Sequence, residues 1–197
     1  MAAYPISVHH RVTRAIVGFG RRTDYGLMRR VNRWRAPLWL QLWMTAATRG
    51  GDGWLWYAMG LVVAVFGGAR RIAALLAVAL AVAAGIALFL KLKRLCGRPR
   101  PCVIEPHCWA KLLPPDQFSF PSGHTITAFA VAISLGAFYP DALPGLLFCA
   151  ASVAASRILL GMHFLTDVIA GAIVGSALGA LSFFFVSSYG AGLGLMG

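Results

Sequence analysis

Two uninterrupted apolar runs constrain this chain more than any other feature of its sequence. Residues 72–90 and 168–186 are each 19 residues long and contain neither a charged residue nor proline. At 1.5 Å per residue, a helix of this length covers about 28 Å, close to the ~30 Å thickness of bilayer hydrocarbon. Such runs are typical of membrane-spanning helices and are not expected in a water-soluble domain.

Composition supports the same interpretation. Of the 197 residues, 59% are apolar and 12% are charged, about half the charged fraction of ~25% that is usual in soluble domains. Three shorter apolar runs, residues 54–68, 125–139 and 143–160, bring the expected number of spanning segments to five. Backbone polar groups must be paired in lipid, so we expect helices rather than strands. The predicted fold class is an all-α, polytopic transmembrane helix bundle.

The first 50 residues have a different character. They hold nine of the 18 Lys and Arg residues, and apolar residues recur in them at helical spacing. This pattern predicts amphipathic helices that lie in the membrane interface with arginine on the wet face. The Trp-rich stretch 36–48 would reach only about 20 Å as a helix, too short to cross the bilayer. We therefore expect one domain, 1–197, with a basic interfacial segment over 1–50 and a helix bundle over 54–186.

Counting five crossings places three polar segments on one side of the membrane. They are the segment before residue 54, the loop 91–122 and the connection 157–167. Ionisable residues at membrane depth are functional candidates by default. The candidates on this side are Lys91, Arg98, Ser122, Gly123, His124, Arg157, His163 and Asp167.

These residue types suit the chemistry of a phosphate group. Ser122 and Gly123 precede His124 at a helix start, where free backbone N–H groups and the helix dipole attract anions. His163 and Asp167 are four residues apart, so on one helix they share a face and can hydrogen-bond. That bond would leave the other imidazole nitrogen free as a nucleophile or base. Each feature also has a structural interpretation: a helix cap, a structural His–Asp pair, or an arginine that extends to the interface.

The distribution of acidic residues argues against metal-dependent phosphate chemistry. No two of them have metal-ligand spacing, and the chain has no Gly-rich phosphate-binding loop. Cys108 beside His107 hints at zinc, but four ligands of suitable spacing are absent. We therefore expect no metal and no other cofactor, with Arg and Lys supplying the positive charge. The six acidic residues are Asp24, Asp52, Glu105, Asp116, Asp141 and Asp167.

Three motifs together resemble the type 2 phosphatidic acid phosphatase (PAP2) superfamily. They match that superfamily in residue type, spacing and order, over about residues 54–186. The superfamily usually has a six-helix bundle, and the first helix is replaced here by the basic interfacial segment. The motifs are Lys91-(six residues)-Arg98-Pro99, Pro121-Ser122-Gly123-His124, and Ser156-Arg157-(five residues)-His163-(three residues)-Asp167.

The resemblance implies a metal-independent phosphatase that acts on a phosphorylated lipid. His163 would attack phosphorus and become phosphohistidine, Asp167 would orient His163, and His124 would protonate the leaving oxygen. The implied substrates are phosphatidate, phosphatidylglycerophosphate, polyprenyl phosphates or diphosphates, and lipid A phosphates. The residues implied to bind the phosphate oxygens are Lys91, Arg98, Arg157, Ser122 and the Gly123 N–H.

Three other functions stay open at this point. A phosphotransferase would use the same phosphohistidine and pass the phosphate to a second lipid. Vanadate-dependent haloperoxidases share the phosphate pocket but are generally soluble, whereas this chain is strongly apolar. A non-enzymatic protein could bind anionic lipid as a scaffold or channel.

Charge also predicts orientation and partners. Sixteen of the 18 Lys and Arg residues fall on the side of the polar clusters, and only Arg70 and Arg71 fall on the other. The positive-inside rule therefore favours an active site on the cytoplasmic face of a bacterial inner membrane, although many superfamily members work on the opposite face. A Cys102–Cys108 disulfide would instead require an oxidising compartment. We expect anionic membrane lipids as partners and no nucleic acid.

Small residues at four-residue spacing predict one close helix contact. Gly171, Gly175 and Gly179 recur along the last apolar run. Glycines one turn apart let another helix backbone approach closely. The contact would lie within the bundle or, alternatively, in a homodimer.

Overall fold

The structure, a computed structural model, describes residues 8–105 and 116–190, without the side chains of residues 8–19 and 21. The described chain is helical apart from short connections and contains no strand, which confirms the predicted all-α class. The main helices are α1 (Val8–Arg33), α2 (Leu38–Arg49), α3 (Leu55–Phe66), α4 (Arg71–Cys96), α5 (Pro101–Ile104), α6 (Gly123–Phe138), α7 (Leu143–Leu159) and α8 (Leu165–Gly190).

A helix forms at each of the five predicted apolar runs. Three helical segments are long and apolar enough to cross a membrane: Gly68–Cys96, Pro140–Leu159 and Leu165–Gly190. The 16 residues of α6 and the 12 residues of α3 reach only about 24 Å and 18 Å, less than the hydrocarbon thickness. The helix bundle is thus confirmed, while the count of five full crossings stays a prediction.

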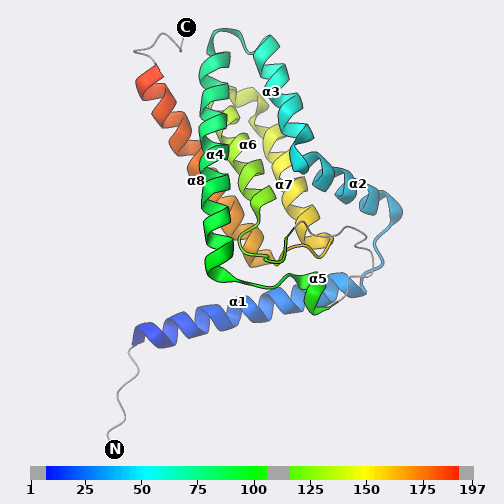
Figure 1. The fold of residues 1–197 in the computed structure, drawn as a ribbon. Helices are drawn as coiled ribbons and strands as arrows, with labels where there is room; N and C mark the ends of the chain where they lie inside the picture. Colours follow the sequence, from blue (N-terminus) through cyan, green and yellow to red (C-terminus); the bar gives the residue numbers. More distant parts are fainter. Residues whose placement is uncertain (1–7, 106–115, 191–197) are drawn as a thin grey trace, which may run out of the picture.

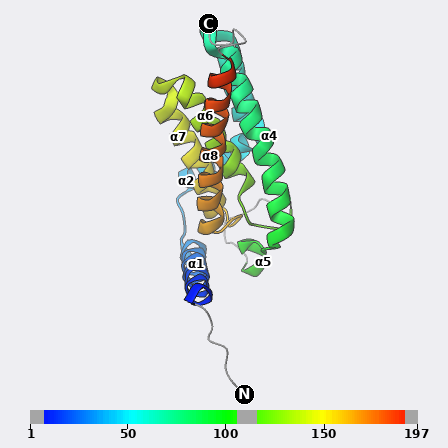
Figure 2. The ribbon, with the colours of Figure 1, turned by 90° about the vertical axis from the view of Figure 1, so that its left-hand side faces the viewer.

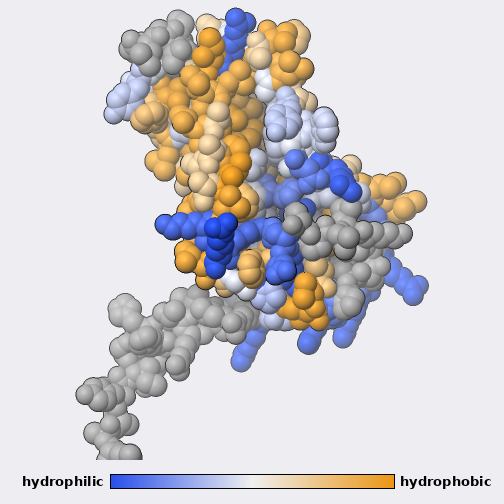
Figure 3. Space-filling model, in the orientation of Figure 1, coloured by the Kyte–Doolittle hydropathy of each residue, from blue (hydrophilic) through white to orange (hydrophobic). Residues whose placement is uncertain are grey.

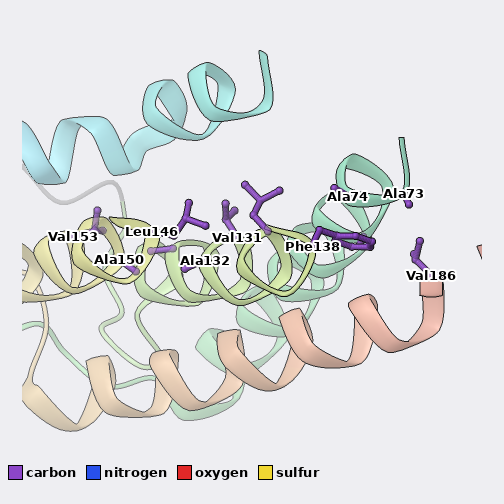
Figure 4. Packing of buried hydrophobic residues seen from close by; sticks show 12 residues of the cluster. Ala73, Ala74, Val131, Ala132, Phe138, Leu146, Ala150, Val153 and Val186 are labelled. Carbon is purple, nitrogen blue, oxygen red and sulfur yellow. The ribbon is translucent and has the colours of Figure 1, made fainter. Parts of the chain in front are cut away.

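The central helix of the bundle is α6, which packs against α4, α7 and α8 (Figure 1). The buried core at this contact is built from small side chains, since six of its 12 buried residues are alanine. Larger side chains such as Phe138 and Leu146 complete this cluster (Figure 4). Small side chains let the helix axes approach closely, and this brings the ends of neighbouring helices close together.

The predicted glycine seam is the contact between α8 and α6. A Cβ atom added at Gly171, Gly175 or Gly179 would lie 2.8, 2.3 or 2.7 Å from a backbone carbonyl oxygen of α6 or of its cap. The oxygens belong to Ser122, Ile126 and Ala130, respectively. Packing within the bundle is therefore confirmed. Within the chain, α6 covers this face, and a homodimer stays a prediction.

The basic N-terminal segment is helical in α1 and α2, as predicted, and α1 crosses one end of the bundle at a large angle (Figures 1 and 2). Asp24, Met28 and Val31 are buried on one side of α1, whereas Arg22 and Arg29 are exposed. Hydrophilic side chains gather at this end of the molecule, and apolar side chains cover most of the visible side of the bundle (Figure 3). This separation matches the predicted distribution, with basic residues at one end of the bundle and apolar residues along its helices.

Arg98 joins α1 to the start of α8. Its Nη2 lies 2.6 Å from Oδ2 of the buried Asp24, and its Nη1 lies 2.6 Å from Oδ1 of the buried Asp167. Asp24 also accepts a hydrogen bond of 3.0 Å from the backbone N–H of Thr166. The guanidinium stands 4.1 Å from the ring centroid of Phe164, close enough for a cation–π contact. One arginine thus balances two buried carboxylates that belong to distant segments.

The glycine seam generates the first prediction. Alanine normally stabilises a helix relative to glycine by about 0.5–1 kcal/mol, but Gly175→Ala places a methyl group against the Ile126 carbonyl. We expect Gly175→Ala to destabilise the bundle by about 1–3 kcal/mol, as overpacking does, measured as a lower midpoint of thermal unfolding in detergent. Gly145→Ala in α7 is the control, because nothing lies within 4 Å of its added Cβ. Equal thermal midpoints for the two variants would contradict the close contact between Gly175 and the α6 backbone.

Candidate active site

Three helix ends meet around one cavity of about 400 Å³. Its lining residues come from the end of α4 and the start of α6. Both helix ends face the end of the bundle that α1 crosses (Figure 1). Phe89 and Leu90 form its apolar side, and charged or polar residues form the rest. The remaining lining residues are Gly51, Asp52, Lys93, Arg100, Asp116, Gly123, His124, Thr127 and His163.

His163 lies in the short connection between α7 and α8 and is 2% exposed. Its Nδ1–H donates a hydrogen bond of 2.6 Å to the carbonyl oxygen of Ser119. Its Nε2 lies 3.1 Å from Nη1 of Arg100, which donates to it. Burial, together with the charges of Arg157 and Arg100, lowers the pKa of His163 to about 3. The imidazole is therefore neutral near pH 7, with its basic nitrogen at the cavity.

Asp167 does not make the expected hydrogen bond to His163. Its Oδ2 lies 3.8 Å from Nδ1, whose hydrogen points to the Ser119 carbonyl instead. The prediction assumed one continuous helix, but α8 begins only at Leu165. The Asp167 carboxylate instead accepts the backbone N–H of Phe164 at 2.9 Å, which is the reciprocal bond of a capping box. Asp167 therefore fixes the turn that carries His163.

Two cations at the cavity belong to residues that the sequence analysis did not select. Arg100 is 1% exposed and donates to Asp116 Oδ1 at 2.9 Å and to the Met162 carbonyl at 2.9 Å. The buried Lys93 forms a short ion pair with Asp116. Burial alone would raise the pKa of Asp116, but hydrogen bonds from Lys93 and Arg100 hold that pKa below its usual range. The carboxylate therefore stays charged and keeps both cations in place.

Lys91 and Arg98, the cations selected from the sequence, do not reach the cavity. Lys91 is exposed, and Arg98 is held by Asp24 and Asp167. The spacing of a lysine, six residues and Arg-Pro occurs twice in this segment, once from Lys91 and once from Lys93. The structure brings the second occurrence, Lys93 with Arg100-Pro101, to His163. That second match is the sequence signal that could have identified Lys93 and Arg100.

Ser122 and Gly123 lie at the start of α6, and Arg157 lies near the end of α7, close enough for its charge to act on His124 and His163. Arg157 is 3% exposed and donates from Nη1 to Thr48, while its buried Nε has no hydrogen-bond partner among the described residues. Ser122 caps α6, and the Gly123 backbone lines the cavity. The first N–H groups of a helix have no partner within the helix. Such a helix start and an unpaired N–H of a buried arginine both suit an anionic ligand.

His124 follows Gly123 at the cavity, as predicted. Its Nε2 lies 2.7 Å from Oδ1 of Asp52, a residue of the connection between α2 and α3 that the sequence analysis did not select. The described residues contain no cluster of three or more His, Cys, Asp or Glu that could hold a metal ion. The Cys102 thiol is free, and Cys108, its proposed disulfide partner, lies outside the described residues.

Curated relatives align with part of the chain. Decaprenylphosphoryl-5-phosphoribose phosphatase of Mycobacterium tuberculosis is 37% identical over 106 residues, which are 54% of this chain and 55% of the relative. Phosphatidylglycerophosphatase B of Bacillus subtilis is 37% identical over 92 residues, which are 41% of this chain and 43% of the relative. The chain thus spans about half the length of the curated relatives it matches.

Solved structures align over most of the chain. The crystal structure of Aquifex aeolicus LpxE superposes with a TM-score of 0.68 and 29% identity, covering 81% of this chain and 93% of that one. The first transmembrane PAP2 type phosphatidylglycerolphosphate phosphatase from Bacillus subtilis gives a TM-score of 0.66 and 27% identity, covering 87% and 86%. Three helices among the described residues are able to span a bilayer, and with a transmembrane enzyme as structural neighbour this identifies the chain as an integral membrane protein. The PAP2 superfamily profile matches residues 72–189, more than half of the chain, so the chain belongs to the PAP2 superfamily.

Proposed function

We propose that this protein hydrolyses a phosphate monoester or diphosphate of a membrane lipid through a phosphohistidine intermediate and without a metal ion. The observation that carries the proposal is the convergence of the His163 imidazole, two buried cations and the His124 imidazole on one cavity. A cavity of this kind provides a nucleophile, positive charge for the phosphoryl oxygens and an acid for the leaving group, which are the requirements of phosphoryl transfer.

In the first step, Nε2 of His163 attacks phosphorus, and the bond between phosphorus and the ester oxygen breaks. The Ser119 carbonyl holds the hydrogen on Nδ1, so the lone pair that attacks is on Nε2. That lone pair accepts from Arg100 when no substrate is present. The substrate phosphate therefore takes over the Arg100 donor before Nε2 can react. Asp167 supports the step by fixing the turn at Phe164.

Positive groups would hold the three phosphoryl oxygens during this transfer. Lys93 and Arg100 lie at the cavity. The N–H groups after Ser122, including that of Gly123 at the cavity, would supply further donors, as would the unpaired Nε of Arg157, whose charge acts on both His124 and His163. This set replaces Lys91 and Arg98 of the sequence analysis and retains the other three predicted phosphate ligands. Preorganised donors of this kind stabilise the charge that develops in the transition state.

His124 would complete both halves of the reaction. Its imidazolium gives a proton to the leaving oxygen, and the alcohol or lipid phosphate departs. The neutral His124 then takes a proton from water as that water attacks the phosphohistidine. The phosphorus–nitrogen bond breaks, inorganic phosphate forms and His163 is restored.

The substrates for which the relatives are named are lipids that carry a phosphate, and we expect the same class of substrate here. The two curated relatives are named for a decaprenylphosphoryl phosphoribose and for phosphatidylglycerophosphate. The apolar side of the cavity, Phe89 and Leu90, suits the lipid portion next to the phosphate. We therefore expect phosphate release from one of phosphatidate, phosphatidylglycerophosphate, a polyprenyl phosphate or diphosphate, or a lipid A phosphate.

The direct test is phosphate release by the purified protein in detergent or bilayer discs, with these lipids as a panel and with chelator present. We expect activity that survives chelation and is lost in His163→Ala, while the thermal midpoint is retained. His124→Ala should lose about 10²–10⁴-fold with alkyl substrates, the usual contribution of a general acid, and less with a very good leaving group. Full activity of His163→Ala would exclude the mechanism. Phosphate recovered on a second lipid would indicate a transferase instead.

A second test separates the two overlapping lysine–arginine matches. Lys93→Gln and Arg100→Lys should lower kcat/KM by about 10²–10³-fold, as the loss of a charge-stabilising donor does. Lys91→Gln is the matched control, because the exposed Lys91 is two residues away on the same helix and lies outside the cavity. We expect its activity to equal that of the unmodified protein. Loss of activity in Lys91→Gln alone would instead indicate that Lys91 and Arg98, the first match, bind the phosphate.

We further infer that the active site faces the cytoplasm and that exposed arginines of α1 bind anionic lipid headgroups. The bias of Lys and Arg toward this end supports both statements. A membrane-impermeant maleimide should label Cys96 and Cys102, two free thiols near this end, only after cells are permeabilised. Asp141→Cys, at the exposed turn between α6 and α7, should be labelled on intact cells. The reverse pattern would place the site outside.

A further inference from the structure

We infer that Asp52 is a positioning residue for His124, holding its imidazole in place and stabilising its protonated form. This inference rests on the proposed phosphatase function and adds a carboxylate from outside the three motifs. Asp52 Oδ1 lies 2.7 Å from His124 Nε2, although the two residues are 72 positions apart in the sequence. Both residues line the same cavity as His163.

The connection around Asp52 is built to lie close to His124. It is a five-residue turn, Gly50–Trp54, between α2 and α3. A Cβ added at Gly51 would lie 3.0 Å from a Val153 methyl group and 3.4 Å from the His124 ring, so a larger residue here would require the Val153 side chain to shift. Gly53 has φ +136°, a conformation that L side chains rarely adopt. Glycines on either side of Asp52 thus allow its carboxylate to reach the imidazole.

Two structural roles for Asp52 are less well supported. It is not the cap of α3, since that helix begins at Leu55 without a side-chain cap hydrogen bond among the described residues. Its other ion-pair partner, Arg49, stands 3.9 Å away, and both side chains are more than 40% exposed. Exposed pairs at such distances contribute little to stability. The contact with His124 is the short one.

The chemistry of the acid explains why a carboxylate is useful at this point. Nε2–H of His124 donates to Asp52, so the second proton of the imidazolium is on Nδ1. That proton goes to the leaving oxygen, and the neutral ring keeps its Nε2–H, which leaves Nδ1 to receive a proton from water in the second step. Burial of His124 disfavours its imidazolium, and so do the positive charges of Arg157 and Lys93. Asp52 supplies the opposing negative charge.

The experiment compares Asp52→Asn, Asp52→Glu and the control Asp141→Asn, whose carboxylate is exposed at the opposite end of the bundle. Each is assayed with an alkyl lipid phosphate and with p-nitrophenyl phosphate over a pH series. Asp52→Asn should lower kcat for the alkyl substrate by about 10- to 100-fold, as the loss of an orienting partner does, and should spare the aryl substrate. The alkaline limb of its pH–rate profile should move to lower pH, because the imidazolium loses its carboxylate. Asp52→Glu should restore most of the activity.

Outcomes of this experiment separate the two proposals. If the unmodified protein releases no phosphate from any substrate, the proposed function fails. If it is active and Asp52→Asn has the same pH profile and the same ratio of alkyl to aryl activity, Asp52 has no role in positioning His124. Equal losses with both substrates, accompanied by a lower thermal midpoint, would also overturn the inference, since they indicate a structural role. Asp141→Asn should behave as the unmodified protein throughout.

Discussion

A charge that is removed from water must be paired, and this constraint organises the polar end of the bundle. Single charges at membrane depth are costly. Arg98, Lys93 and Arg100 each have a carboxylate beside them, whereas the buried Arg157 forms no ion pair with any of the described residues. Arg98 joins Asp24 to Asp167, and Asp116 joins Lys93 to Arg100. Each pair connects segments that are distant in sequence. Small side chains let the apolar helices pack closely, and the ion pairs hold the connecting segments against the helix ends.

Apolar patterning predicted the helices well, because a membrane helix must satisfy its backbone internally and leaves a long uncharged run. It could not select between the two overlapping lysine–arginine matches. Two residues of α-helix turn the side chain by about 200°, so Lys91 and Lys93 point to nearly opposite faces of α4. The choice depends on which face packs against α6 and α8, and spacing within one segment carries no information about that packing.

The contacts of the two histidines show the same limit. Spacing predicted an imidazole–carboxylate bond between His163 and Asp167, but the helix starts after His163 and the Ser119 carbonyl takes the Nδ1 hydrogen. The carboxylate that does bond to a histidine is that of Asp52, which binds His124 from a turn far away in the chain. Local spacing identifies the residues of a site, whereas pairing among them is decided by tertiary packing.

The ion pair of Asp24 has a consequence for the extent of the folding unit. A fragment trimmed to the apolar bundle alone, beginning near residue 54, would keep the ion pair between Arg98 and Asp167. It would lose Asp24, the second carboxylate that Arg98 binds. It would also lose the Thr166 N–H bond at the first turn of α8. The basic helix α1 is therefore part of the frame of the candidate active site, and a fragment that keeps this frame has to include residue 24.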